Sequence, residues 1–339
     1  MELITGGTGF LGAHLAANIL LTGNDVRILR RPFSNFNELN IVFRYYFDNN
    51  APEMLKKINF AEGDITDIFS VEAALENVDN VFHCAGFVSF VKSDKQRMIE
   101  INEKGTENLV NVLLNNNIKK LCHVSSIAAL GRNDDNKLIT EDNEWIEHNK
   151  NTSYAISKYK AEKVVWRAIN EGLNAVIVNP GVILGVGGFD NVSGKLFNMV
   201  KNGLKFYTEG VNGYVDATDV SQIMIKLTES DISAEKFILT SENVSYEWFF
   251  NEIAKNLSVK PPTIYANSFL RNFIVVADYL KTLLTGRKRF YTFELARLAN
   301  SCSYYSSNKV EKVLKYRFIP IAETIEKICG FFKNNAVLL

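Results

Sequence analysis

The N-terminal segment constrains the fold of this chain more than any other part of it. Glu2-Leu3-Ile4 has the composition of a short buried strand, and a run with helical periodicity extends from Phe10 to Leu20. Gly6, Gly9 and Gly12 fall between the two, in the spacing G-x-x-G-x-x-G. A strand, a glycine-rich turn and a helix in this order predict the start of a parallel α/β sheet.

Each of the three glycines meets a separate backbone requirement. Gly6 permits a tight turn, Gly9 lets the backbone approach a phosphate closely, and Gly12 lets the helix pack closely on the strand. The N–H groups and the positive end of the helix then face an anion, so the loop is expected to hold the pyrophosphate of a dinucleotide. The alternative is an ordinary glycine-rich turn. The loop residues expected to bind the cofactor are Gly6, Thr8, Gly9, Phe10, Leu11 and Gly12.

Two arginines follow the second expected strand, 25–29. Folds that bind NAD place a carboxylate near this strand end for the ribose 2′-hydroxyl, whereas Arg30 and Arg31 stand here instead. A guanidinium can bind a 2′-phosphate in forked geometry. NADP(H) is therefore favoured over NAD(H), and the alternative is that both arginines are solvated loop residues.

The next two strands end in acidic or small residues. The third strand, 59–65, contains Asp64, whose carboxylate can accept a hydrogen bond from an adenine amino group while Ile65 lies against the ring. The fourth strand, 78–82, leads into small residues that let a cofactor lie close to the backbone. The residues expected to bind the cofactor here are Asp64, Ile65, Cys84, Ala85 and Gly86.

Tyr154 and Lys158 are four residues apart in a helical stretch and share one helix face. A free phenol titrates near about pH 10, which is too high for acid–base catalysis at neutrality, and an adjacent ammonium lowers its pKa. Ser126 follows the strand 119–124, and its hydroxyl can hold a carbonyl oxygen beside Tyr154. Ser125 either assists or satisfies backbone groups at the strand end. Taken alone, the Tyr and Lys spacing also arises by chance on surface helices.

Two further residues belong to this candidate site. Thr152 or Ser153 can cap the helix that carries Tyr154. Asn102 lies on the helical stretch between the fourth and fifth strands, and it has two interpretations. It positions a water that connects Lys158 to solvent, or it bonds to neighbouring backbone.

These residues together resemble the extended short-chain dehydrogenase/reductase family, within the NAD(P)-dependent epimerase/dehydratase superfamily. The resemblance runs from residue 1 to about 240. The positions that carry it are Gly6, Gly9, Gly12, Asp64-Ile65, His83-Cys84-Ala85-Gly86, Asn102, Gly105-Thr106, Ser125-Ser126, Tyr154, Lys158, Asn179-Pro180-Gly181-Val182 and the segment 214–220. The resemblance implies that Tyr154 is the catalytic acid/base, that Lys158 binds the nicotinamide ribose, and that Ser126 orients the substrate. It also implies that Pro180, Gly181 and Val182 line the nicotinamide.

Within the family, the nearest resemblance is to the dihydroflavonol-4-reductase-like and 3β-hydroxysteroid-dehydrogenase-like branch. Sugar-nucleotide dehydratases carry an Asp-Glu pair just after the serine strand end, whereas this chain has Ile127-Ala128-Ala129. We predict an NADP(H)-dependent oxidoreductase that interconverts a carbonyl and an alcohol on a small hydrophobic substrate, with Tyr154 as acid/base. The alternatives are an NAD-dependent nucleotide-sugar epimerase and a non-catalytic dinucleotide sensor or protein-binding module.

Composition narrows the choice of partners and compartment. Lys and Arg number 38 and Asp and Glu number 38, so the formal net charge is zero, which argues against general nucleic-acid binding. The four cysteines and four histidines show no metal-ligand spacing, so no metal site is expected. We expect a cytoplasmic protein with reduced cysteines, no signal peptide, no transmembrane segment and a small-molecule substrate. A homodimer through the helices near 92–115 and 152–171 is implied by the resemblance only.

Strand and helix patterns alternate to about residue 240, which predicts a Rossmann-type, doubly wound parallel sheet. Its fifth to seventh strands are expected at 119–124, 173–178 and 236–240. The pattern after Ser241 is mainly helical, at 245–257, 266–285, 291–300 and 321–333. The dinucleotide-binding domain is therefore assigned to 1–181, with 211–240 returning to it. A smaller, mainly helical substrate-binding domain is assigned to 182–210 and 241–339.

Two aromatic groups have open roles. The insertion 35–57 contains the run 43–47 and is expected to have a helix of its own, which either covers the adenine end of the cofactor or packs on the fold; packing is favoured. A second group suits an apolar substrate cleft, although each member alone is more typical of a core. Its members are Phe189, Phe197, Phe206, Tyr207, Phe269 and Phe273.

Overall fold

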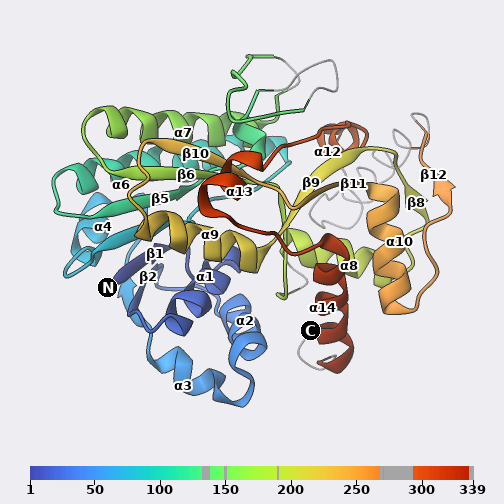
Figure 1. Ribbon diagram of the computed structural model, residues 1–339, viewed down its shortest axis with the longest axis horizontal. Coiled ribbons are helices and arrows are strands. Elements are labelled where there is room, and N and C mark those ends of the chain that lie inside the picture. The colour runs from blue at the N-terminus through green and yellow to red at the C-terminus, as the bar shows by residue number, and fades with distance from the viewer. Residues whose placement is uncertain (132–137, 149–150, 189–190, 268–269, 271–292, 336–339) are drawn as a thin grey trace.

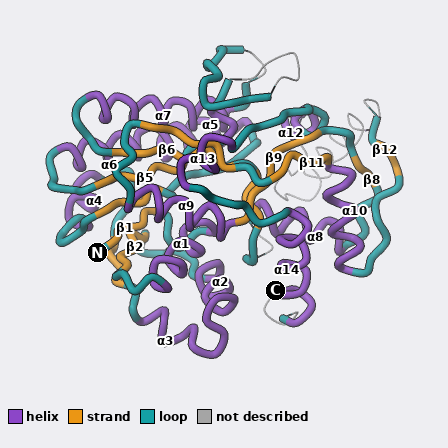
Figure 2. Tube along the Cα trace, viewed as in Figure 1, coloured by secondary structure: helices purple, strands orange, loops and turns teal. Residues whose placement is uncertain are grey.

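The computed structural model describes residues 1–131, 138–148, 151–188, 191–267, 270 and 293–335. Its main element is a seven-stranded parallel sheet in the order β10-β6-β5-β4-β1-β2-β3 (Figures 1 and 2). The strands are β1 (Glu2–Thr5), β2 (Val26–Arg30), β3 (Asn59–Glu62), β4 (Asn80–His83), β5 (Lys120–Val124), β6 (Ala175–Pro180) and β10 (Glu235–Leu239). This is the Rossmann strand order with a seventh strand added, so the predicted fold class is confirmed.

Helices cover both faces of this sheet, which explains why its central strands are continuously apolar. Every residue of β5 and β6 is buried. One face packs against α4 (Ile68–Ala74), α6 (Gly105–Leu114) and α7 (Ser153–Asn170). The other packs against α1 (Phe10–Leu21) and α9 (Ala217–Glu229). The order of strands reverses between β1 and β4, and in such sheets a crevice forms at the carboxyl ends of those strands.

A second layer of structure follows β6 and lies on the opposite side of Figure 1 from the N-terminus. It contains a three-stranded sheet, β11-β9-β7, and a two-stranded sheet, β12-β8. The strands are β7 (Val182–Leu184), β8 (Phe206–Tyr207), β9 (Val211–Asp216), β11 (Glu242–Ser245) and β12 (Ile264–Tyr265). Among the described residues after β6, the helices other than α9 are α8 (Val192–Lys201), α10 (Tyr246–Leu257), α12 (Phe293–Leu298), α13 (Asn308–Leu314) and α14 (Ile321–Asn334).

The helices predicted at 245–257 and 321–333 are confirmed as α10 and α14, and α12 occupies part of the helix predicted at 291–300. The helix predicted at 266–285 lies almost entirely outside the described residues. The division into two domains stays a prediction. Within the segment 211–240, α9 packs on α1 and β10 joins the main sheet, whereas β9 pairs with β7 and β11. Among the described residues, no helix has both the length and the apolar composition needed to cross a membrane.

The insertion 35–57 forms α2 (Asn37–Phe47) and α3 (Ala51–Lys56). Its aromatic run packs into the fold, as predicted: Phe43 is fully buried, and the Tyr46 hydroxyl hydrogen-bonds with the imidazole of His14 on α1 at 3.0 Å. Helix α2 also reaches the second layer. The Glu38 carboxylate accepts hydrogen bonds from the Gly188 backbone at 3.1 Å and from the Asn191 side chain at 3.2 Å. Asn191 in turn caps α8 by accepting from the Gly194 N–H at 2.7 Å.

Candidate active site

The glycine-rich loop between β1 and α1 has the geometry that a pyrophosphate requires. Gly6 has a φ of +72°, and a Cβ there would lie 2.7 Å from the Ala85 backbone nitrogen. A Cβ on Gly12 would lie 2.7 Å from the Cα of Gly7 and closer still to the Gly6 carbonyl oxygen. Helix α1 begins after Gly9 with no side-chain cap and no acidic residue in its first turn. Its first N–H groups are therefore available to an anion, and the residues present fit a dinucleotide.

Arg30, the last residue of β2, and Arg31, which follows it, line the same cavity as the glycine loop, but they differ in their surroundings. The Arg30 guanidinium lies 5.7 Å from the ring centroid of Phe36 and 5.9 Å from that of Phe60, and it pairs with the Glu62 carboxylate at 3.6 Å. Arg31 is exposed. Of the two, Arg31 is therefore the better placed to meet a further anion, because Arg30 already has a carboxylate and two aromatic rings around it.

The carboxyl end of β3 carries the two residues expected near the adenine. The strand ends at Glu62, two residues before the predicted Asp64. One Asp64 oxygen accepts from both the N–H and the hydroxyl of Thr66, at 2.9 and 2.8 Å. Ile65 is buried, and a Cβ on Gly105 would lie 2.8 Å from its side chain. Both residues line the cavity.

The carboxyl ends of β4 and β6 form the middle of the cavity wall. Cys84, Ala85 and Gly86 follow β4, and a Cβ on Gly86 would lie 3.9 Å from the Lys158 Nζ atom. Pro180, Gly181 and Val182 also line the cavity. A Cβ on Gly181 would lie 2.5 Å from the Gly213 carbonyl oxygen, so a glycine is required where β6 passes β9. All six predicted residues therefore face the space between the glycine loop and Tyr154.

Tyr154, Ser126 and Lys158 meet in this cavity, although they come from separate elements. Thr152 caps α7 by accepting from the Ala155 N–H at 3.0 Å, which places Tyr154 in the first turn of the helix. Both hydroxyl side chains line the cavity, and the Ser126 side chain favours the ionised form of the Tyr154 phenol. The buried Lys158 ammonium donates to the Val124 carbonyl at 2.7 Å. A hydroxyl pair and an ammonium beside a dinucleotide-sized crevice are the groups that acid–base chemistry on a carbonyl requires.

The electrostatics of this group correct one expectation from the sequence. Lys158 was expected to lower the pKa of Tyr154, but burial raises the pKa of Tyr154, and the Ser126 side chain opposes that rise only in part. Burial also lowers the pKa of Lys158 to about 8. The Lys158 ammonium donates instead to the Val124 carbonyl on β5.

Asn102 is buried in a π-helical segment, Ile99–Lys104, just before α6. Its side-chain oxygen accepts from the Phe87 N–H at 2.7 Å, and its amide donates to the Phe87 carbonyl at 3.0 Å and to the Ser157 hydroxyl at 2.9 Å. These bonds use both amide hydrogens. The side chain thus fixes the loop after β4 against α7, which agrees with the second interpretation, bonding to neighbouring backbone.

Ser125 lines the cavity, and its hydroxyl donates at 2.7 Å to the carboxylate of Glu162, while its part in holding a cofactor stays a prediction. Glu162 is a buried residue that the sequence reading missed. The signal for it was present: Tyr154, Lys158 and Glu162 recur every four residues along one face of α7.

The cavity has a volume of about 1340 Å³ and extends from the glycine loop into the second layer. Of the aromatic residues predicted to form a cleft, Phe206 and Tyr207 line it. Phe197 is instead fully buried in the core beneath α8, where it contacts Phe249 and Phe332. The predicted residues Phe189, Phe269 and Phe273 lie outside the described part of the chain. The buried histidines lie within the sheet, His83 at the end of β4 and His123 one residue before the end of β5.

Comparisons with known proteins agree with this geometry. A family model described as the NAD dependent epimerase/dehydratase family matches residues 2–237. A sterol-4-alpha-carboxylate 3-dehydrogenase (decarboxylating) of Candida albicans is 29% identical over 347 residues, covering 93% of this chain and 92% of that protein. A putative dihydroflavonol 4-reductase of Synechocystis sp. is 22% identical over 338 residues, covering 98% and 94%. The crystal structure of gox2253 has a TM-score of 0.80 at 26% identity and covers 98% of both chains.

Proposed function

Because the chain belongs to the NAD dependent epimerase/dehydratase family, we propose that it is an NADP(H)-dependent oxidoreductase that interconverts a carbonyl and an alcohol, with Tyr154 as acid/base. The observation that carries this proposal is that Ser126, Tyr154 and Lys158 line one cavity together with the glycine-rich loop. A protein that only bound a dinucleotide would have no need of an acid/base group there.

Ser126, Tyr154 and Lys158 each have a separate role in the proposed reaction. When bound, the nicotinamide ring supplies or accepts the hydride. In the reductive direction, the hydroxyls of Ser126 and Tyr154 donate hydrogen bonds to the carbonyl oxygen, and Tyr154 transfers its proton to that oxygen as the alcohol forms. Lys158 uses one of its three hydrogens on Val124, which leaves two for the cofactor ribose. The reverse reaction returns the proton to Tyr154.

The substrate is proposed to be hydrophobic. The half-buried rings of Phe206 and Tyr207 line the outer part of the cavity together with Leu196, Met199 and Leu204. Apolar side chains of this kind suit a flat or bulky apolar molecule and offer few partners to a charged sugar nucleotide. The names of the two relatives, a sterol-carboxylate dehydrogenase and a dihydroflavonol reductase, support a multi-ring substrate.

NADP(H) is proposed as the preferred cofactor. The exposed Arg31 lines the cavity next to Arg30 and Ser34. Its guanidinium can bind a 2′-phosphate bidentately, while Arg30 is held by its aromatic neighbours. A homodimer through the helices near 92–115 and 152–171 and a cytoplasmic location are also proposed, and light scattering on the purified protein checks the first.

The experiment that tests the function compares Tyr154→Phe with Tyr159→Phe. Tyr159 lies on the same helix as Tyr154, and its ring stacks on Trp145 with the ring centroids 4.4 Å apart. Tyr159→Phe is a matched control because it removes the same hydroxyl from a tyrosine of that helix. NADPH oxidation with a panel of cyclic ketones should fall about 10²–10⁴-fold for Tyr154→Phe, because the general acid is removed, and hardly change for Tyr159→Phe. NADPH affinity should be similar in both variants.

Two results would count against the proposal. Activity of Tyr154→Phe within a few-fold of the parent enzyme would exclude Tyr154 as the acid/base. A protein that purifies with tightly held NAD and consumes no cofactor in net turnover would instead favour the epimerase alternative.

A further inference from the structure

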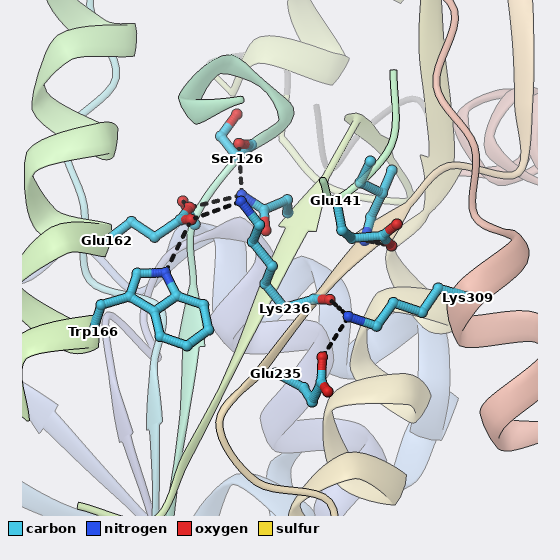
Figure 3. Close-up of polar contacts among 10 residues, drawn as sticks. Ser126, Glu141, Glu162, Trp166, Glu235, Lys236 and Lys309 are labelled. Atoms are coloured by element: carbon cyan, nitrogen blue, oxygen red, sulfur yellow. Dashed lines mark hydrogen bonds and ion pairs between the residues drawn. The ribbon is translucent and has the colours of Figure 1, made fainter. Parts of the chain in front are cut away.

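Glu162 is a buried carboxylate beneath the candidate active site that the mechanism above does not use. It is 4% exposed and lies one turn beyond Lys158 on α7. Figure 3 shows its position among the side chains that converge on it. The carboxylate accepts from the Ser125 hydroxyl at 2.7 Å and from the Asn179 amide at 2.9 Å. It also lies 3.8 Å from the Lys236 ammonium, which comes from β10.

These contacts connect Glu162 to the backbone of Ser126. The Asn179 amide that donates to Glu162 also donates to the Ser126 carbonyl at 3.0 Å. Asn179 stands at the end of β6, and Ser125 and Ser126 follow β5, so one carboxylate joins the carboxyl ends of two neighbouring strands. If this carboxylate were lost, two buried donors would need new partners, which is costly in a site shielded from water. The position of Ser126 therefore depends on Glu162.

The charge of Glu162 also acts on Lys158. The titratable groups that face Lys158 are Glu162 and Tyr154 on α7, His83 and Cys84 at the end of β4, and His123 on β5. Burial lowers the pKa of both histidines, so they are neutral, and it raises the pKa of the Cys84 thiol to about 12, so it is protonated. Within the described part of the chain, Glu162 is thus the carboxylate that favours the charged form of Lys158.

We propose that Glu162 is a positioning residue of this active site, which fixes the strand end that carries Ser126 and supplies the buried counter-charge that keeps Lys158 an ammonium. The inference rests on the proposed function for its catalytic meaning, because Lys158 must be charged to bind a ribose hydroxyl through all of its donor hydrogens. Lys236 is the cation that faces Glu162 from β10 and balances its remaining charge.

The test uses Glu162→Gln, since an amide keeps the size and one acceptor of the side chain and removes its charge. Lys158 lines the cavity, so a small acylating reagent can reach its amine, and peptide mass spectrometry can follow the labelling rate of Lys158 against pH. Removing the negative charge of Glu162, one helix turn from Lys158, should lower the pH midpoint of Lys158 labelling by about one pH unit. Labelling at neutral pH should become roughly tenfold faster. The alkaline limb of the kcat profile should move down by the same amount, and Glu162→Asp should restore it partly.

Glu235→Gln is the matched control. Glu235 precedes Lys236 on β10 and points away from Glu162, toward Lys309, with which it pairs at 2.5 Å (Figure 3). Its neutralisation removes a carboxylate from the same strand and should leave the labelling midpoint of Lys158 in place. If Glu162→Gln does not fold, Lys236→Met serves instead. This variant removes a cation close to Glu162, so the pH midpoint of Lys158 labelling should stay the same or rise.

The outcomes separate this inference from the proposed function, because labelling needs neither cofactor nor substrate. A lowered midpoint in Glu162→Gln without activity on any carbonyl supports the inference and counts against the function. An unchanged midpoint and an unchanged kcat profile in an active Glu162→Gln enzyme would overturn the inference and leave the function standing. A lowered midpoint in Lys236→Met would also overturn it.

Discussion

Replacement of Gly12 by alanine tests whether the glycine loop holds a pyrophosphate. The new Cβ would lie 2.7 Å from the Gly7 Cα and closer to the Gly6 carbonyl oxygen, and both are backbone atoms that cannot turn aside. Ordinary contacts of this kind need well over 3 Å, so α1 must move away from the loop by about 1 Å. Overpacking of this type costs roughly 1–3 kcal/mol of the free energy of unfolding.

The same displacement moves the first N–H groups of α1 away from a phosphate. Hydrogen bonds to charged groups contribute about 1.5–3 kcal/mol, so NADPH affinity should fall by roughly 10–100-fold if one such bond is lost. Fluorescence titration with NADPH measures the affinity, and thermal unfolding measures the stability.

Gly330→Ala is the control, because nothing lies within 4 Å of a Cβ there and the residue sits inside α14. It should raise stability by up to about 1 kcal/mol and leave affinity unchanged. If Gly12→Ala binds NADPH within twofold of the parent protein, the loop does not hold the pyrophosphate.

Two further predictions concern the cofactor and the pH dependence of stability. Arg31→Ala should weaken NADPH binding about tenfold or more and leave NADH binding nearly unchanged, since only NADPH carries the 2′-phosphate; equal losses in parallel titrations would contradict the assignment. Burial raises the pKa of Asp219 to about 6 from its ordinary value of 3.8, so the folded state binds the proton more tightly than the unfolded state. The free energy of unfolding should therefore fall as pH rises from about 4 to 6, by at most roughly 3 kcal/mol from this group. Urea unfolding at several pH values should show a shallower fall for Asp219→Asn, and equal slopes would refute the reasoning.

The main sheet was predictable because its strands are buried on both faces. β5 and β6 are apolar runs that admit few other interpretations, and both were predicted to within two residues at each end. The small strands were not predictable from pattern. Strand β11 has 4 residues, so each of its faces carries only a pair of side chains. All of its residues are exposed or half-buried, so no hydrophobic alternation marks the strand. The pairing of β9 with β7 depends on where the chain returns after α8, which local sequence does not encode.

The candidate site was predictable in membership but not in electrostatics. The spacing of Tyr154 and Lys158 along α7 follows from helix geometry, so their shared face could be inferred. The raised pKa of Tyr154 could not, because it depends on burial by segments distant in sequence. The role of Asn179 is similar: its partner Ser126 is 53 residues away and becomes a neighbour only when β5 and β6 pair. Arg30 also gained partners that its own segment does not reveal, namely Phe60 and Glu62 on β3.

The contact between Glu38 and the start of α8 has a consequence for engineering. The insertion 35–57 is remote from Tyr154, yet the Glu38 carboxylate binds both Gly188 and the residue that caps α8. A chimaera that imports the 182–210 segment of a relative to change substrate preference would lose the contact between that segment and Glu38. Transplanting α2 together with that segment would keep the Glu38 contact, so the two stretches form one exchangeable module although residues 48–181 separate them along the chain.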